Sequence, residues 1–326
     1  MLLVGSDDGV YRIDAFDDPA VDSASATRLF GGDRVMRLRQ FEGLSGVFAA
    51  TADGLSHSSD GQRWTDLGVP EETVYAVGAS IDGERLYAGT RPAAIYRTEW
   101  DDAAAADDGD VAWTECDGFQ DLPSRDEWRL PRHENLAQVR DVTADPAGED
   151  RIVAGVEVGG VHLSEDDGDT WAERADGVHD DVHELCVVGP DSYVAATGFG
   201  LYRTHDAGHS WTRLDGDVPQ RYFRSAFALD GTVYAGANMA NSSTWDDGDA
   251  DPGCYRVHDD GRLDPLALPD EAGTVTGMGA ADGDLVLATH RGHVFVQRDG
   301  AVSDVGRFPT PADTTGRYTP VTWLSA

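Results

Sequence analysis

The residues best suited to chemistry in this chain stand at the ends of short apolar runs. Six of them carry groups that can donate hydrogen bonds to an anion: Arg91, Arg140, Arg221, Arg224, Asn238 and His290. The planar, permanently charged guanidinium group of Arg matches the shape of carboxylate, sulfate and phosphate. These residues predict a binding site for a small anion.

Three further residues could supply catalysis at the same place. Glu157 and His183 can each give or take a proton, and Tyr222 opens another apolar run. If the chain is an enzyme, we expect Glu157, His183 and Tyr222 to be its catalytic residues.

The same side chains could instead hold the fold together. Arg140 could pair with Glu157, and Arg224 with Glu184, in a buried network of salt bridges. A buried charge destabilises the fold unless it is paired with another charge or binds a ligand. The anion-binding site and the structural network of salt bridges therefore both remain open.

A metal site is a weaker alternative. The segment HDDVH, from His179 to His183, contains two imidazoles and two carboxylates, which are common ligands of divalent metals. It runs from a loop into a strand and therefore lacks the helical spacing that places two His on one face. No phosphate loop, nucleophile elbow or dinucleotide fingerprint is present, so we expect neither a metal nor another cofactor.

The elements that must position these residues are repeated β-strands. Seven similar runs occur: Leu2–Ser6, Val47–Thr51, Leu86–Thr90, Ile152–Val156, Tyr193–Thr197, Val233–Ala237 and Leu285–Thr289. Similar apolar runs precede and follow them, and a period near 40 residues with four short strands is typical of a propeller blade. We predict an all-β, seven-bladed β-propeller that occupies residues 1–326 as one domain.

The order of the strands predicts how the ring closes. The chain begins with the second strand of a blade and ends, at Val321, with a first strand. Residues 1–30 should therefore provide three strands of blade 1, and residues 318–326 the fourth. This closure removes the free edges of the sheets.

A motif marks the corners between third and fourth strands. Ser164–Trp171 reads SEDDGDTW and Thr204–Trp211 reads THDAGHSW. In both, a hydroxyl and an Asp can bond the amides of a tight turn, while Gly supplies the positive φ. On these residues the chain resembles the Asp-box (BNR-repeat) β-propellers, a family that includes sialidases, the sortilin ectodomain and the photosystem II stability factor.

The resemblance implies a fold but no particular reaction. Sialidases of this family hold a carboxylate with three Arg and use Tyr and an acidic residue in catalysis. This chain lacks the N-terminal Arg-Ile-Pro signature that supplies the first Arg, and offers only Arg34 and Arg37 in that region. Sialidase activity is therefore not expected. A glycosidase- or lyase-like activity on an acidic sugar remains the enzymatic alternative.

Alignment of the blades gathers the ionisable residues in blades 3 to 5, on the face opposite the Asp-box corners. We call this face the mouth. Two long loops, residues 119–137 and 238–253, belong to the same face and predict a lid or a partner surface, with Trp128 and Trp245 as candidate contacts. The low-complexity insert at residues 101–110 is expected to be disordered.

The charge of the chain is extreme. Sixty acidic residues stand against 25 basic ones, which gives a net charge of −35, and every basic residue is Arg. Such a surface remains soluble where salt screens its repulsion, so the composition is typical of an extreme halophile. Nucleic acid and anionic membranes are not expected as partners.

The three cysteines and the hydropathy suggest the compartment. Cys116, Cys186 and Cys254 are odd in number and lack zinc-finger spacing, which predicts free thiols in a reducing compartment. No run of 18 apolar residues and no signal-peptide pattern occurs. We expect a cytoplasmic monomer, a non-catalytic binding or scaffold propeller that presents its mouth to a small anion or a protein.

Overall fold

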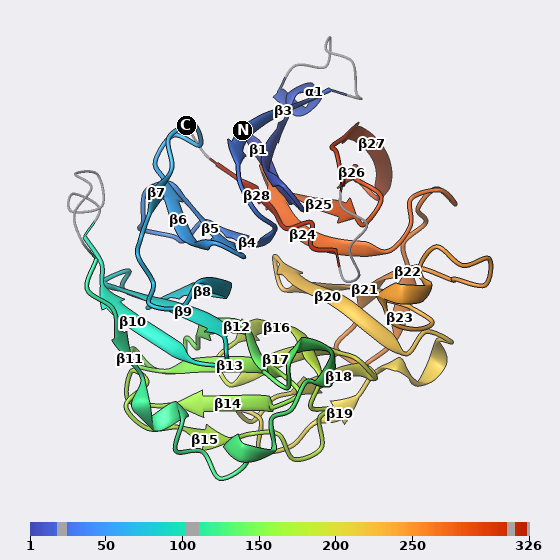
Figure 1. The fold of residues 1–326 in the computed structure, drawn as a ribbon. Helices are drawn as coiled ribbons and strands as arrows, with labels where there is room; N and C mark the ends of the chain where they lie inside the picture. The colour runs from blue at the N-terminus through green and yellow to red at the C-terminus, as the bar shows by residue number, and fades with distance from the viewer. Residues whose placement is uncertain (18–24, 102–110, 312–316, 325–326) are drawn as a thin grey trace.

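The computed structural model describes residues 1–17, 25–101, 111–311 and 317–324 (Figure 1). Seven four-stranded antiparallel sheets form a ring, which confirms the predicted seven-bladed β-propeller. The first strands of the blades surround the centre of the ring in Figure 1. Most of the insert predicted to be disordered, residues 102–110, lies outside the described residues.

The strands follow the predicted repeat. In each blade they are given from the innermost outward: blade 1, β28 (Val321–Trp323), β1 (Leu2–Ser6), β2 (Gly9–Ile13) and β3 (Ala26–Gly31); blade 2, β4 (Val35–Arg39), β5 (Val47–Thr51), β6 (Gly54–Ser58) and β7 (Thr65–Asp66); blade 3, β8 (Thr73–Ala79), β9 (Arg85–Arg91), β10 (Ile95–Glu99) and β11 (Thr114–Glu115); blade 4, β12 (Gln138–Ala144), β13 (Ile152–Glu157), β14 (Gly160–Ser164) and β15 (Ala172–Glu173). Blade 5 comprises β16 (Val182–Gly189), β17 (Ser192–Thr197), β18 (Gly200–Thr204) and β19 (Thr212–Arg213); blade 6, β20 (Tyr222–Leu229), β21 (Thr232–Asn238), β22 (Gly253–Val257) and β23 (Leu263–Pro265); blade 7, β24 (Val275–Ala281), β25 (Asp284–Thr289), β26 (His293–Arg298) and β27 (Ala301–Arg307).

Helical segments are short and lie in the connections. They are α1 (Asp14–Asp17), η1 (Asp117–Phe119), η2 (Arg125–Glu127), η3 (Pro131–His133), η4 (Asp215–Asp217) and η5 (Ser242–Thr244). Three of them, η1 to η3, belong to the long loop before blade 4, and η5 belongs to the long loop of blade 6.

The core lies between neighbouring blades. All five residues of β5 and all five of β6 are buried, because another blade covers each side of the sheet. Phe48 of blade 2 and Leu86 of blade 3 belong to one such apolar cluster. This packing explains why the second strands read as continuous apolar runs rather than as alternating ones.

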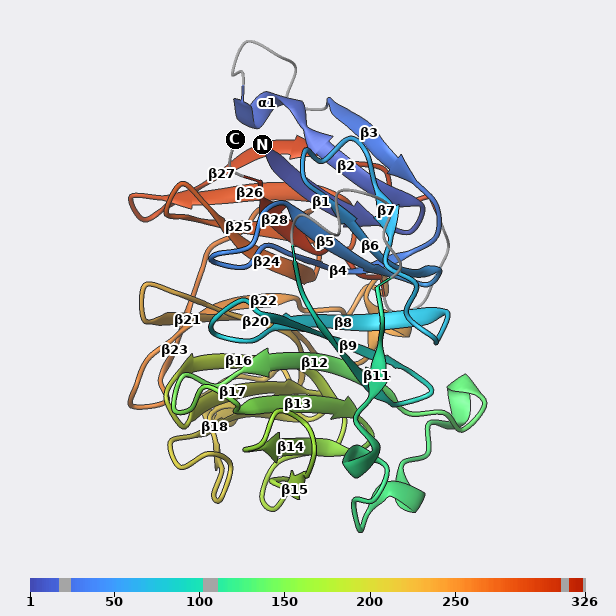
Figure 2. The same cartoon turned by 90° about the vertical axis from the view of Figure 1, so that its left-hand side faces the viewer.

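The ring closes through β28, as predicted. This strand pairs with β1 through Leu2 with Trp323, and Val4 with Val321. The two ends of the described chain also meet, because the Met1 amino group donates to the Leu324 carbonyl oxygen at 2.8 Å (Figure 2). One sheet is therefore built from segments at opposite ends of the sequence.

The predicted corner geometry is present in blade 4. The Ser164 hydroxyl donates to Asp166 at 2.9 Å and accepts from the Gly168 amide at 2.8 Å. Asp166 also accepts from the Thr170 amide, and Gly168 has a φ of 89°, a value that favours glycine. The corresponding bonds occur at Thr204 in blade 5.

A β-bulge recurs at the mouth end of the innermost strand in blades 2 to 7. In each case one residue is skipped in the pairing with the second strand: Met36, Tyr75, Arg140, His183, Arg224 and Thr276. A bulge bends its strand and redirects the extra side chain, and it often occurs beside functional sites. The fold thus presents one irregular residue in each of blades 2 to 7 around the mouth of the channel.

Candidate functional site

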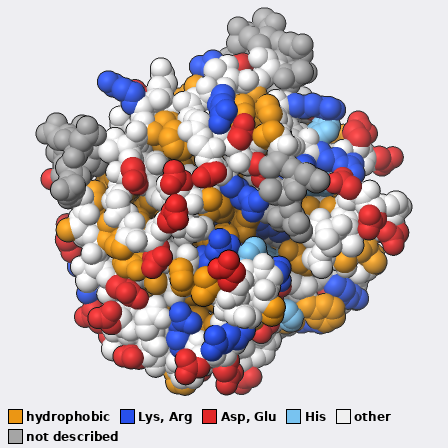
Figure 3. Space-filling model, viewed as in Figure 1, with side chains coloured by type: hydrophobic (Ala, Val, Ile, Leu, Met, Phe, Trp, Pro, Cys, Tyr) orange, Lys and Arg blue, Asp and Glu red, His pale blue; other side chains and the backbone are white. Residues whose placement is uncertain are grey.

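Two of the candidate residues, Arg140 and Arg224, line the centre of the ring. In the space-filling view, Arg side chains lie around the central hollow, and Asp and Glu side chains are spread over the surrounding surface (Figure 3). A cavity of about 310 Å³ occupies the channel, and its walls come mainly from the innermost strands β4, β20, β24 and β28. We call it the channel cavity.

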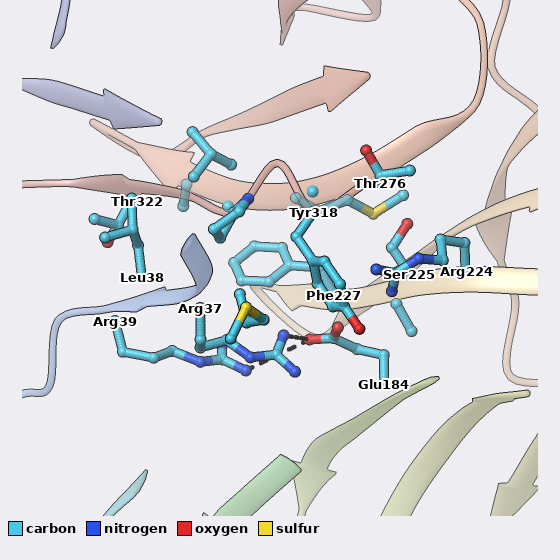
Figure 4. Close-up of a pocket in the computed structure, with 18 of the residues that line it drawn as sticks. Arg37, Leu38, Arg39, Glu184, Arg224, Ser225, Phe227, Thr276, Tyr318 and Thr322 are labelled. Carbon is cyan, nitrogen blue, oxygen red and sulfur yellow. Dashed lines mark hydrogen bonds and ion pairs between the residues drawn. The ribbon is translucent and has the colours of Figure 1, made fainter. Parts of the chain in front are cut away.

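A network of charges crosses the channel cavity. Arg37 of blade 2 donates to Glu184 of blade 5 at 2.5 Å and to the Arg140 carbonyl oxygen at 2.6 Å. Its guanidinium group also lies 3.4 Å from Asp141. Arg39 extends beside Arg37 toward Glu184 (Figure 4). Burial alone would raise the pKa of Glu184, but Arg37 and then Arg39 hold it below its usual value.

Replacing Arg37 should destabilise the fold. In Arg37→Met, Glu184 and Asp141 would lose their shortest cationic partner while remaining in the interior. Breaking a buried pair from one side typically costs about 3–5 kcal/mol, and we expect a loss of that size in the free energy of unfolding. Urea titration at constant KCl concentration measures it. Arg63→Met is the control, since Arg63 has a side chain that is 92% exposed. A loss below about 1 kcal/mol for Arg37→Met would contradict the role given to this network.

Glu157 is held by three donors. It accepts hydrogen bonds from Arg140 at 2.6 Å, from Gln138 at 2.5 Å and from Arg132 of the long loop before blade 4. Burial would raise the pKa of Glu157, but Arg140 and then His183 lower it below its usual value. The Arg140–Glu157 pair that was predicted as a structural alternative is therefore present.

His183 lies beside Tyr222 but faces backbone and carboxylate groups. Its Nδ1 donates to the Phe223 carbonyl oxygen at 2.7 Å, and its Nε2 lies 3.4 Å from Asp181. The His183 and Tyr222 rings are 4.5 Å apart. Glu157 and His183 are only 3% and 1% exposed, so the candidate catalytic residues do not meet in an open pocket.

Arg224 has a different environment from Arg140. It is 3% exposed, and no carboxylate of the described residues lies within salt-bridge distance of it. Its guanidinium group lies 4.5 Å above the Tyr318 ring and donates to the Arg317 carbonyl oxygen at 3.4 Å. Burial, and then the charge of Arg140, lower the pKa of Arg224.

Two details of the predicted site are corrected. The pair between Arg224 and Glu184 is absent, because Arg37 reaches Glu184 from across the channel. Arg224 belongs to β20 of blade 6, so the wedge of ionisable residues extends from blade 3 to blade 6 instead of ending at blade 5.

Arg91 and Arg221 lie away from the channel cavity. Arg91 donates to the Tyr75 hydroxyl at 3.0 Å and contacts His133 at 3.3 Å. Arg221 pairs with Asp215 at 3.3 Å near the outer part of blade 5. These two Arg do not converge with Arg140 and Arg224 on one ligand position.

Asn238 and His290 make contacts that support the loops of blades 6 and 7. Asn238 donates to the Thr274 hydroxyl at 2.7 Å, and His290 accepts from the Thr274 amide at 3.0 Å. His290 also packs against Trp245 of the long loop in blade 6, with ring centres 5.3 Å apart. Their predicted role in binding a ligand stays a prediction.

The residues that sequence reasoning missed are Arg39 and Tyr318. Arg39 lies two residues after Arg37 on β4, and both line the channel cavity. Tyr318 lies just before β28, outside any regular strand. It reaches across the channel, since its hydroxyl accepts from Arg140 of blade 4 at 2.6 Å.

A second depression lies on the mouth face between the loops of blades 5 and 6. We call it the mouth groove; it has a volume of about 610 Å³ and is lined by Arg132, Asp181, Gly198, Phe199, Arg221, Tyr222, Met239, Ala240, Asn241, Ser242 and Ser243. Phe199 and Met239 are 49% and 43% exposed. Arg213 lies 4.6 Å from the Phe199 ring and supports it from one side.

The two Trp of the long loops are not the contact surface that was predicted. Trp128 and Trp245 are each 3% exposed. Trp128 packs against Phe119 and His162, whereas Trp245 packs against Tyr222 and His290. These two rings therefore anchor the loops, and the large hydrophobic side chain that these loops expose is Met239.

Within the described residues, no group of three or more His, Cys, Asp or Glu side chains is arranged to hold a metal ion, and the HDDVH segment forms no such group. No helix in that part of the chain is long and apolar enough to cross a membrane. The three cysteines are free, and burial raises the pKa of each thiol to about 12.

Comparison with known proteins identifies the fold. Neither known protein families nor curated proteins give a match to this chain. Among solved structures, the chain is similar to a GH74 xyloglucanase from Xanthomonas campestris (TM-score 0.56, 16% identity, 83% of this chain and 45% of that one). It is also similar to YCF48 bound to D1 peptide (0.53, 15%, 83% and 81%) and to the WD40 β-propeller domain of Doa1 (0.58, 14%, 84% and 83%). The chain spans less than half the length of the xyloglucanase.

Proposed function

We propose that this chain is a non-catalytic binding propeller of the Asp-box type, whose mouth groove holds an extended segment of a partner protein. The observation that carries the proposal is the exposure of Phe199 and Met239 together in one groove, between Arg132 and Arg221. Aromatic, Met and Arg side chains are enriched in protein interfaces, and Met adapts its shape to different partners. The cytoplasmic location and the monomeric state expected from the sequence are part of this proposal.

The groove suits a segment that carries both an apolar and an acidic side chain. Phe199 and Met239 offer an apolar surface, and the Arg132 side chain is 56% exposed beside them. Arg221 is 38% exposed and shares its charge with the buried Asp215. Arg132 donates to Glu157 through one nitrogen, and the exposed remainder of its guanidinium group could pair with an acidic side chain on the partner. The similarity to YCF48, a propeller bound to a peptide, supports this type of ligand without identifying it.

The enzymatic alternative receives less support from the geometry. Glu157 is already bonded to three donors, and His183 donates to a carbonyl oxygen. Of the three candidate catalytic residues, only Tyr222 borders the mouth groove. A general acid or base must reach the substrate within hydrogen-bond distance, which these two buried groups do not offer to the groove.

Selection from a displayed library of random peptides tests the proposal. Peptides enriched on the wild-type protein should bind the double variant Phe199→Ala/Met239→Ala at least ~10-fold more weakly, which corresponds to about 1.4 kcal/mol, because the two apolar contacts are removed. Fluorescence polarisation with labelled peptides measures the dissociation constants.

Ile81→Ala is the matched control for this experiment. Ile81 is the other large exposed hydrophobic residue of the described chain, with 50% exposure, and it lies between β8 and β9 on the opposite face. Its replacement should leave peptide binding unchanged. The proposal is wrong if no peptide is enriched, or if the enriched peptides bind the double variant as tightly as the wild type.

A further inference from the structure

The walls of the channel cavity carry more positive than negative charge, although the protein as a whole is strongly acidic. The charged groups on the walls are four guanidinium groups and one carboxylate: Arg37, Arg39, Arg140, Arg224 and Glu184. Asp141 pairs with Arg37 and Glu157 pairs with Arg140, and these two carboxylates reduce the excess of positive charge. Four Arg thus face three carboxylates in a protein with a net charge of −35.

Each of the three carboxylates already forms an ion pair with a particular Arg. Glu184 and Asp141 pair with Arg37, and Glu157 pairs with Arg140 at 2.6 Å. Arg39 reaches Glu184 and Asp141 only at 3.5 and 3.6 Å. Arg224 has no carboxylate of the described residues within reach. The surplus positive charge therefore lies on Arg224 and, in part, on Arg39.

The position of Arg224 is well defined, although no carboxylate of the described residues serves as its counter-ion. The Tyr318 ring lies 4.5 Å from the guanidinium carbon, and the guanidinium group points toward this ring and the cavity (Figure 4). A buried charge without a partner is destabilising by several kcal/mol in the general case. An aromatic face offsets only part of this cost. An anion in the cavity would offset the rest of the cost of burying the Arg224 charge.

We propose that the channel cavity binds one small free oxyanion, a carboxylate, sulfate or phosphate, between Arg224 of blade 6 and Arg39 of blade 2. The volume of about 310 Å³ accommodates such an ion together with several water molecules. Glu184 also faces the cavity, but Arg37 at 2.5 Å neutralises it and limits its repulsion of the ligand. This site is separate from the mouth groove, and the proposal does not depend on the function given to that groove.

Calorimetric titration tests the site with potassium phosphate and with citrate, at constant KCl concentration. We expect saturable binding of one ion per chain to the wild type. Arg224→Gln should weaken binding by about 10- to 100-fold, the range for loss of a hydrogen bond to a charged group. Arg39→Gln should weaken it as well, and this more exposed position remains informative if Arg224→Gln does not fold.

Arg221→Gln is the matched control, because Arg221 is half-exposed, paired with Asp215 and outside the cavity. It should bind phosphate as the wild type does, and so should the Phe199→Ala/Met239→Ala variant, which separates this site from the mouth groove. Crystals soaked in selenate should show an anomalous peak within hydrogen-bond distance of Arg224. The proposal fails if neither phosphate nor citrate binds saturably, if both Arg variants bind like the wild type, or if the selenate peak lies outside the cavity.

Discussion

Truncation of the chain after Pro320 should abolish cooperative unfolding. The deletion removes β28 and leaves β1 with an unpaired edge, from which Leu2, Leu3 and Val4 lose their partners. An exposed edge of this kind pairs readily with other chains, so we expect aggregation as well. Thermal melting followed by circular dichroism, together with light scattering, measures both effects.

The energetic basis of this expectation lies in the buried residues of the closing strand. Val321 and Leu324 are each 5% exposed, and Trp323 packs against Phe16 with ring centres 5.0 Å apart. Burial of each such side chain contributes about 1.5–3 kcal/mol. The sum is comparable to the whole stability of a typical domain, about 5–15 kcal/mol. Truncation after Leu324 is the control and should melt like the full chain. A cooperative, wild-type melting curve after removal of β28 would contradict the closure of the ring.

Transfer from molar KCl to ~50 mM salt should unfold the protein. At about 1 M salt the Debye length is only ~3 Å, whereas at 0.1 M it is ~10 Å, so neighbouring carboxylates on the surface begin to repel one another. With a net charge of −35, this repulsion disfavours the compact state. Circular dichroism during stepwise dialysis would follow the loss of β structure.

Sucrose at the same osmolality provides the control for this experiment. It favours compact states because it is excluded from the protein surface, and it does not screen charge. If sucrose maintains the fold as well as KCl does, screening is not the cause of the salt requirement. Retention of the native spectrum at ~50 mM salt without additives would refute the hypothesis of a halophilic protein.

The fold could be predicted because the same pattern of apolar strands occurs in seven copies. The apolar second strands, such as Val47–Thr51, are buried by blades on both sides, and one weak copy does not obscure the pattern. The closing strand followed from the order of strands at the two ends. Such a repeat shows which strand of a blade each segment forms, and the second strands were therefore located correctly.

The site was less accessible to sequence reasoning, because its contacts connect opposite sides of the ring. Arg37 meets Glu184 across the channel, 147 positions away, and no local pattern relates them. Tyr318 lies outside any regular strand, so an alignment of strands could not place it at the channel. Arg140 and Glu157, in contrast, are neighbours within blade 4, and their pairing was one of the two alternatives that the sequence left open.

The closing strand also determines when the protein can finish folding. Met1 and Leu324 meet although they are 323 positions apart, so blade 1 remains incomplete until nearly the whole described chain has been synthesised. At roughly 5–20 residues per second, this delay is on the order of 15 to 65 s. During that time β1 carries an open edge, and β28 from another nascent chain has the same sequence as the strand it awaits. We therefore expect two chains that exchange their last strands to be the characteristic misfolded product of this architecture.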